Sequence, residues 1–238
     1  MAAVTFEIGT ADVGNTPNPS GAFTPATDDL LVVFCVGSAT VPGVDVLTSS
    51  ISGNTFTLIT SFQYDTSTAV IQAFVANQLI TSAEAISQTV TWTPADTATS
   101  SEICVFAVAG VTRTGISAIK QSAGQANQAA ATTPAPVFAA NALTGNPTLG
   151  GVGNETNPAT MTAPTNWTEP VGGDIGQGTP IGGLEVVFRD SGFTGTTITW
   201  GSASDTNFAS LILEIDSSAV ANKVKDPIGK GVVPWARV

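Results

Sequence analysis

The chain has 238 residues, of which 42% are hydrophobic and 11% are charged, a balance that excludes an intrinsically disordered protein. Its length suits one large β domain or two small ones. The net charge of -11 is unevenly spread, because residues 1–222 carry -14 and residues 223–238 carry +3. An acidic body without a basic stripe is not expected to bind nucleic acid.

The first half begins without a targeting signal and then becomes strongly apolar. MAAVTFEIGT has no basic start and no apolar core, so we expect no secretion signal. The longest apolar run, residues 30–36, has the length of a strand and is far too short to span a membrane. Because this run is apolar at every position, we expect a strand that is covered on both faces. Cys35 lies in it and Cys104 in a similar run, so both are expected to be buried thiols, with a disulfide left open.

Further strands are predicted where apolar residues occupy every second position. Residues 90–93 and residues 211–215 alternate in this way, as half-exposed antiparallel strands do. Between them, residues 121–136 are rich in Ala and Gln. A short helix is compatible with that composition, but the Gly, Pro and Thr residues favour a connecting loop, which we place at residues 112–135.

Two parts of the chain resemble each other in the same order. TVTWTPADTATSSEICVFAVAG, residues 89–110, is similar to TITWGSASDTNFASLILEID, residues 197–216, and residues 28–43 align with residues 145–159. Within these parts and between them, the matched positions are Phe56-Thr57 with Trp167-Thr168, Phe74 with Phe188, Trp92 with Trp200, and Ile103–Ala107 with Leu211–Ile215. The common order predicts an internal duplication, with chance similarity between β sequences as the alternative.

Each predicted half has too few strands to bury two faces alone. We therefore expect an all-β fold, an antiparallel jelly-roll-like β-sandwich built from two similar halves, at about residues 20–111 and 136–216. This single domain would cover residues 1–221 and be followed by an extended C-terminal arm, residues 222–238. Two separate sandwiches are the alternative.

The alignment also predicts an apolar strip on the outside of the first half. If Leu211–Ile215 direct their odd-numbered side chains into the core, then Cys104, Phe106 and Val108 point outward. Such a strip has to be covered by the connecting segment, by the arm or by a neighbouring subunit, which makes Phe106 a candidate interface residue. The corresponding outer face of the second half carries Glu214 and is expected to be wet.

The residues that most enzymes use are missing. Without histidine there is no His-based triad or general base and no ordinary zinc site, and the two cysteines lack a metal-binding spacing. We therefore name no catalytic, cofactor-binding or metal-binding residue and expect that the protein is not an enzyme. Calcium binding by loop carboxylates remains possible. Trp92, Trp167 and Trp200 are candidate sugar platforms, but their matched positions favour packing.

With these strands in place, a family resemblance can be stated. ATDDLLVVFCVGSA, the aromatic-rich strands that follow it, and TVTWTPADTATSSEICVFAVAGV resemble the repeated β-sandwich domains of virion structural proteins of tailed bacteriophages. In that family a strand with Asp-Leu-Leu commonly opens the sandwich, and a Thr-rich strand precedes the closing strand. The resemblance spans about residues 20–216 and weakens at Gly150-Gly151. It implies a structural subunit of the head or tail and carries over no catalytic residue.

The C-terminal sequence KVKDPIGKGVVPWARV holds four of the seven basic residues. Its prolines and glycines exclude a regular strand, and Trp beside Arg is typical of interface hot spots. A basic arm on an acidic body is attracted to acidic surface of its own subunit or of an identical neighbour, with a loose end as the alternative. The candidate interface residues are Lys223, Lys225, Ile228, Val233, Trp235 and Arg237, together with Phe106.

These observations predict a non-enzymatic structural protein of a phage virion, in the first place a capsid decoration or auxiliary protein. It would be made in the host cytoplasm, become part of the virion, and contact copies of itself and other virion proteins such as the major capsid protein. Neither nucleic acid nor a membrane is an expected partner. The alternative is a carbohydrate- or receptor-binding module of a tail fibre or another tail component.

Overall fold

The computed structural model is almost entirely β. It describes residues 2–13, 17–37, 45–51, 53–64, 69–94, 100–127, 133–154, 161–176, 183–201 and 207–217. Within these ranges the only helix is η2 (Gly115–Ala118), a single turn of 3-10 helix, and none has the length and apolar character that crossing a membrane would require. The expected all-β fold is confirmed.

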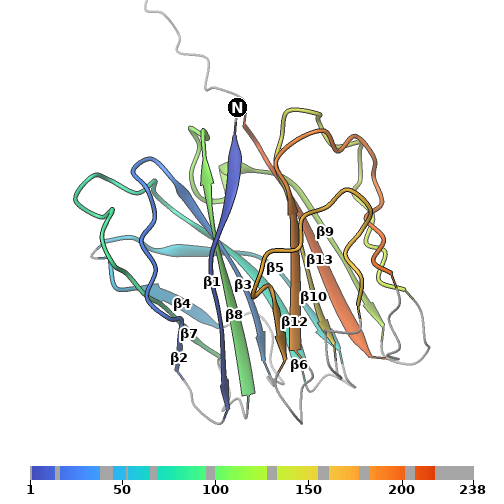
Figure 1. Ribbon diagram of the computed structural model, residues 1–238, viewed down its shortest axis with the longest axis horizontal. Coiled ribbons are helices and arrows are strands. Elements are labelled where there is room, and N and C mark those ends of the chain that lie inside the picture. Colours follow the sequence, from blue (N-terminus) through green and yellow to red (C-terminus); the bar gives the residue numbers. More distant parts are fainter. Residues whose placement is uncertain are drawn as a thin grey trace, which may run out of the picture.

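The strands form three antiparallel sheets (Figure 1). Sheet I has the order β1-β8-β3-β6-β5, with β1 (Ala3–Val13), β3 (Leu30–Gly37), β5 (Phe56–Tyr64), β6 (Ala69–Ala76) and β8 (Ser100–Ala109). Sheet II has the order β11-β12-β10-β13-β9, with β9 (Ile119–Asn127), β10 (Thr148–Asn154), β11 (Asp174–Gly176), β12 (Gly183–Arg189) and β13 (Phe208–Ile215). Sheet III has the order β2-β7-β4, with β2 (Asn18–Pro19), β4 (Val46–Ser49) and β7 (Val90–Thr93).

Sheet I is the middle layer, between sheet II and sheet III. One of its faces carries Phe34 and Phe106, and Phe106 packs edge-on against Phe188 of sheet II with ring centroids 6.1 Å apart. The other face carries Gln72, whose side chain accepts a 3.0 Å hydrogen bond from the Trp92 indole of sheet III. In Figure 1 the three layers run from left to right as sheets III, I and II. Covering on both faces explains why every residue of Leu30–Gly37 is buried.

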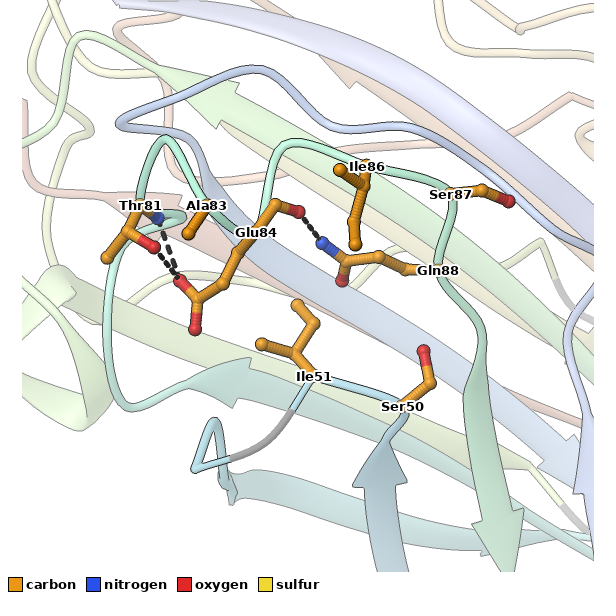
Figure 2. Close-up of a pocket in the computed structure, with 8 residues that line it drawn as sticks. All are labelled: Ser50, Ile51, Thr81, Ala83, Glu84, Ile86, Ser87 and Gln88. Atoms are coloured by element: carbon orange, nitrogen blue, oxygen red, sulfur yellow. Dashed lines mark hydrogen bonds between the residues drawn. The ribbon is translucent and has the colours of Figure 1, made fainter.

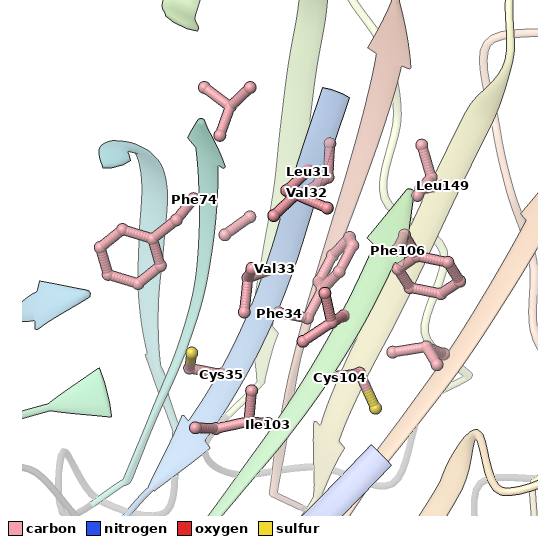
Figure 3. Packing of buried hydrophobic residues seen from close by; sticks show 14 of the residues in the cluster. Leu31, Val32, Val33, Phe34, Cys35, Phe74, Ile103, Cys104, Phe106 and Leu149 are labelled. Carbon is pink, nitrogen blue, oxygen red and sulfur yellow. The ribbon is translucent and has the colours of Figure 1, made fainter. Parts of the chain in front are cut away.

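Each of the two large sheets comes from one continuous half of the chain. Strands stay in the sheet of their own half instead of alternating between the two sheets, which refines the expected jelly-roll-like connectivity. Sheets I and II nevertheless share one apolar core, part of which is drawn in Figure 3. Two glycines of β10 allow the close approach, since a Cβ added at Gly151 would lie 2.7 Å from the Phe34 ring and one at Gly153 would lie 2.9 Å from Val36.

The two cysteines are free and buried, as expected. Cys104 lies opposite Phe34 in the ladder and therefore shares its face, toward sheet II. Cys35 lies opposite Gln72 and faces sheet III. Because their side chains leave sheet I on opposite faces, as Figure 3 shows, the folded chain does not pair them.

The two halves have the same strand order. In each half the last strand pairs on one side with the first strand, at the sheet edge, and on the other side with the central strand. The two orders are β1-β8-β3-β6-β5 and β9-β13-β10-β12-β11. The ladders also agree, because Phe34 lies opposite Cys104 and Ala73, just as Gly151 lies opposite Leu211 and Val186. This agreement supports the duplication inferred from sequence. In the structure the matched positions of β8 and β13, and those of β6 and β12, differ by one residue from the alignment made from the sequence.

That one-residue shift overturns the predicted outer strip. Cys104, Phe106 and Val108 face the shared core, and Phe106 is fully buried, so Phe106 is not an interface residue. A slip of one position in a strand moves each side chain to the opposite face. The outer face of β13 is not wet either, because Glu214 is buried beneath the segment that contains Leu143.

The connection expected at residues 112–135 is only partly a loop. Residues 119–127 form β9, the edge strand that pairs with β13. Its polar sequence does not indicate a strand, but a Cβ at Gly124 would clash with the Phe62 ring, so a residue without a side chain is required where β9 crosses β5. Tertiary contact rather than local pattern therefore makes this segment a strand.

Candidate functional site

A pocket of ≈ 370 Å³ lies beside sheet III, between the end of β4 and the connection from β6 to β7. Figure 2 shows its lining side chains. Two isoleucines form apolar walls: Ile51 is buried, whereas Ile86 is 61% exposed. The remaining lining residues are small or polar, namely Ser50, Thr81, Ala83, Glu84, Ser87 and Gln88.

The turn that carries Glu84 is held by its own hydrogen bonds. The backbone N–H and the hydroxyl of Thr81 donate to Glu84 Oε2, at 2.8 Å and 2.7 Å, and Gln78 Nε2 donates to Glu84 Oε1 at 3.2 Å. A Thr followed three residues later by a Glu is the arrangement of a capping box. The carboxylate is thus fixed at the pocket wall, with lone pairs left for a further donor.

Gln88 supplies the second fixed polar group. Its backbone pairs with Phe23 by two hydrogen bonds of 3.0 Å and 2.8 Å, and its side-chain Nε2 donates to the Glu84 carbonyl oxygen. Gln88 is only 3% exposed, and its Oε1 has no hydrogen-bond partner. In Figure 2 the Gln88 amide lies between Ile86 and Ile51, within the pocket. A buried acceptor of this kind costs about 1–3 kcal/mol until a donor reaches it.

The connection that forms the pocket is longer than its counterpart in the other half. Phe23 pairs with Gln88 in the first half, and in the second half the Phe138 N–H donates to the Thr196 carbonyl oxygen beside the bridge between Val137 and Thr197. Between the preceding strand and this pair lie residues 77–87 in the first half, but only residues 190–195 in the second. The shared architecture therefore does not require the extra residues that line the pocket.

A group of acidic side chains occupies the outer face of sheet II. Asp174 and Glu185 are directly paired residues of β11 and β12. Burial is the largest cause that raises the pKa of Glu185 to about 8, and the charges of Asp174 and Glu169 add to it. Burial, then a hydrogen bond with Glu169 and its charge, raise the pKa of Asp174 to about 7. The Trp200 indole faces Glu185 and opposes the rise, although its geometry falls short of a regular hydrogen bond.

Neither this group nor any other in the described ranges combines three or more Cys, Asp or Glu side chains in an arrangement that could hold a metal ion.

Glu102, another fully buried acid, has no hydrogen-bond partner for either oxygen, and burial raises its pKa well above the usual range. Glu102 and Glu185 are therefore mainly protonated, and so neutral, near pH 7, whereas the pKa of Asp174 lies close to that pH.

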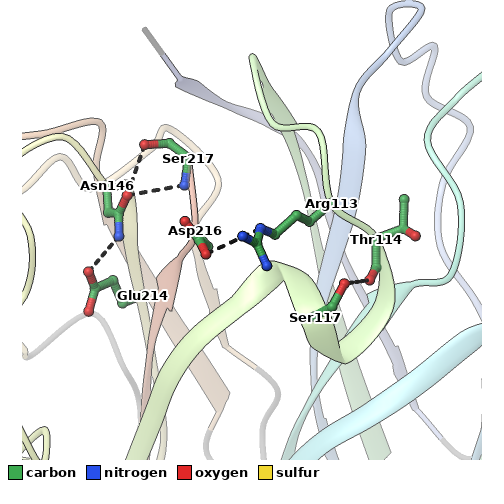
Figure 4. A network of polar contacts seen from close by, with 7 residues as sticks. All are labelled: Arg113, Thr114, Ser117, Asn146, Glu214, Asp216 and Ser217. Atoms are coloured by element: carbon green, nitrogen blue, oxygen red, sulfur yellow. Dashed lines mark hydrogen bonds and ion pairs between the residues drawn. The ribbon is translucent and has the colours of Figure 1, made fainter. Parts of the chain in front are cut away.

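The end of β13 is firmly attached to the body, as Figure 4 shows. Asn146 donates to Glu214 at 2.6 Å and accepts from the backbone and hydroxyl of Ser217, at 3.1 Å and 2.8 Å. Arg113 forms an ion pair of 3.3 Å with Asp216. The last described residue, Ser217, is therefore held in place by defined contacts.

The candidate interface residues of the arm lie outside the described residues: Lys223, Lys225, Ile228, Val233, Trp235 and Arg237. The three tryptophans considered as sugar platforms are placed. Trp92 is buried between sheets I and III, and Trp200 is buried on the face of sheet II that points away from sheet I. Trp167 is partly buried against Phe193. The pocket was missed from the sequence, where the only local signal is the Thr81–Glu84 spacing.

Comparisons with protein-family models, with curated proteins and with solved structures found no match to this chain.

Proposed function

We propose that the protein is a non-enzymatic structural protein of a phage virion, in the role of a capsid decoration or auxiliary protein that docks on its neighbours. The observation that carries the proposal is the division of charge in the chain. By formal count residues 1–222 carry -14, which the protonated buried carboxyl groups Glu102 and Glu185 make less negative, whereas residues 223–238 carry +3 and follow an end that is fastened to the body. Opposite charges on the arm and on the body favour contact between subunits.

The cations of the body do not compete for that contact. Arg113 pairs with Asp216, and Arg189 donates to the carbonyl oxygens of Ser191 and Gly192 at 2.9 Å each. Apart from these two, the only other basic residue before the arm is Lys120. The arm thus holds most of the positive charge that is available to an acidic surface.

The body also has the construction that a repeated surface subunit needs. Three stacked sheets with one core shared by sheets I and II resist bending, because the side chains of both layers interlock. The resemblance to virion β-sandwich domains of tailed bacteriophages agrees with this role. Copies of the same chain and the major capsid protein are the partners that it implies.

The test is mass spectrometry of purified particles of the phage that encodes the chain, with an absolute copy number. Hundreds of copies per particle are expected for a decoration protein, and a handful would place the protein in the tail. Absence from the particles would refute the proposal. Changing Lys223 and Lys225 to Ala in the full chain should mainly reduce the salt dependence of attachment, because screened charges steer the arm.

A further inference from the structure

The pocket beside sheet III has the chemistry of a lysine-binding slot. The two fixed polar groups of the lining offer acceptors, since Glu84 holds its carboxylate at the pocket wall and Gln88 Oε1 is buried without a partner. Ile51 and Ile86 line the same space with aliphatic surface. A lysine side chain matches both features, since its ammonium group has three donors and its stem of four methylenes packs on apolar walls.

We infer that this pocket binds the C-terminal arm, residues 222–238, of a second copy of the chain, with a lysine ammonium group placed between Glu84 and Gln88. The inference rests on the proposed assembly function and names the surface that receives the arm. The arm contains Lys223, Lys225 and Lys230 next to aliphatic residues, which can pack on the exposed side of Ile86.

Charge complementarity favours the arm as occupant. The first basic residue of the chain is Arg113, so the whole half that forms the pocket contains acidic residues and no lysine or arginine. Four of the seven basic residues lie in the arm. A cation approaching the pocket therefore meets no like charge from the sequence that surrounds it.

Geometry favours a second copy over the same one. The arm follows β13 of sheet II, whereas the pocket adjoins sheet III, and sheet I lies between these two layers. The lysines of the arm lie 6 to 13 residues beyond Ser217, so an extended chain can carry them about 20–45 Å from that residue, enough to reach a neighbouring subunit. A contact in which the arm of one copy enters the pocket of the next is heterologous, and it links subunits in a row or a ring.

The first experiment compares two substitutions in the full-length protein, Ile86→Lys in the pocket and Ile116→Lys in η2. The two isoleucines are similarly exposed, at 61% and 56%, so neither change should affect the fold, which circular dichroism will check. Sedimentation velocity should show that the unmodified chain self-associates and that Ile86→Lys weakens association tenfold or more, the effect of losing a hot spot. Ile116→Lys should have no effect. A monomeric unmodified chain, or equal association of both variants, overturns the inference.

The second experiment tests the partner. A chain with Lys223→Ala, Lys225→Ala, Lys230→Ala and Trp235→Ala keeps its pocket, and the Ile86→Lys chain keeps its arm. Each alone should be monomeric, whereas a mixture should form one-to-one dimers, since one intact arm meets one intact pocket. A mixture that stays monomeric shows that no arm enters a second copy and overturns the inference.

The two proposals fail in different ways. If the protein is present in virions but Ile86→Lys neither weakens association nor lowers its copy number there, the assembly function stands and the pocket is not the docking site. If the mixing experiment succeeds but the protein is absent from virions, the arm binds the pocket in an assembly of another kind.

Discussion

The buried acid Glu185 should make the protein less stable as the pH rises. In the folded chain the pKa of Glu185 is about 8, whereas an unfolded chain has the ordinary glutamate value near 4.3. Between these values the folded state holds a proton that the unfolded state has released. The free energy of unfolding therefore falls as the pH rises from about 4 to about 8, and the proton-linked stability is complete only at the acidic end.

Glu185→Gln removes this titration. A rise of this size corresponds to roughly 4–5 kcal/mol, so the free energy of unfolding of the variant should exceed that of the unmodified protein by up to that amount at pH 9 and by only about 1 kcal/mol at pH 5. For a chain of this length the difference is about 10 °C in Tm. The first half shows that the amide fits, since Gln72 occupies the corresponding position and accepts the Trp92 hydrogen bond at 3.0 Å. Asp174 adds less to the pH dependence, because it is half-exposed and solvent screens it.

The assay is urea unfolding followed by tryptophan fluorescence at one-unit intervals from pH 5 to pH 9. Val171→Ala, which changes a fully exposed side chain and removes no ionisable group, is the control and should leave the pH profile unchanged. Parallel profiles for Glu185→Gln and the unmodified protein would show that Glu185 is already ionised at pH 5 in the folded state, and would refute the reasoning.

Three further substitutions test the packing. Trp92→Ala should cost about 3–5 kcal/mol of unfolding free energy, because it empties a fully buried aromatic site; a loss below 1 kcal/mol in thermal or urea unfolding would contradict that burial. Gly151→Ala should destabilise by about 1–3 kcal/mol in the same assay, since its Cβ would lie 2.7 Å from the Phe34 ring, and an unchanged midpoint would mean that the sheets can separate. Asn146→Ala should cost about 1–3 kcal/mol by leaving Glu214 without one of its donors, unless calorimetry finds no change.

The pattern of apolar residues was enough to predict those strands whose residue types directly reflect their burial. The run at residues 30–36 is apolar at every position, and it forms a strand that is covered on both faces. The two tryptophan motifs gave the correct pairing of halves, with Trp92 and Trp200 on corresponding outer faces. Long buried strands and repeated motifs are visible in sequence because burial selects the residue type directly.

Side-chain direction was lost where both faces of a strand are apolar. In β8, Cys104, Val105 and Phe106 are all buried, so alternation offers no sign of which face each occupies. The strand β9 was lost for the opposite reason, since its exposed, polar edge resembles a loop. The pocket depends on Gln88 and Ile51, which come together only through the pairing of β4 with β7, and no local pattern encodes that contact.

The duplication separates what the fold needs from what has been added to it. Both halves keep the strand order, the ladder register and a tryptophan over the outer face of their sheet. They differ in the polar partner of that tryptophan, an amide at Gln72 and a carboxyl group at Glu185, and in the connection at residues 77–87. The second half forms the same sheet with a shorter connection. The longer connection of the first half, with its fixed carboxylate and its unpartnered amide oxygen, is therefore not needed for the stability of the sandwich. The cost of that buried acceptor is offset only when a donor arrives, and three of the chain's four lysines lie on the arm.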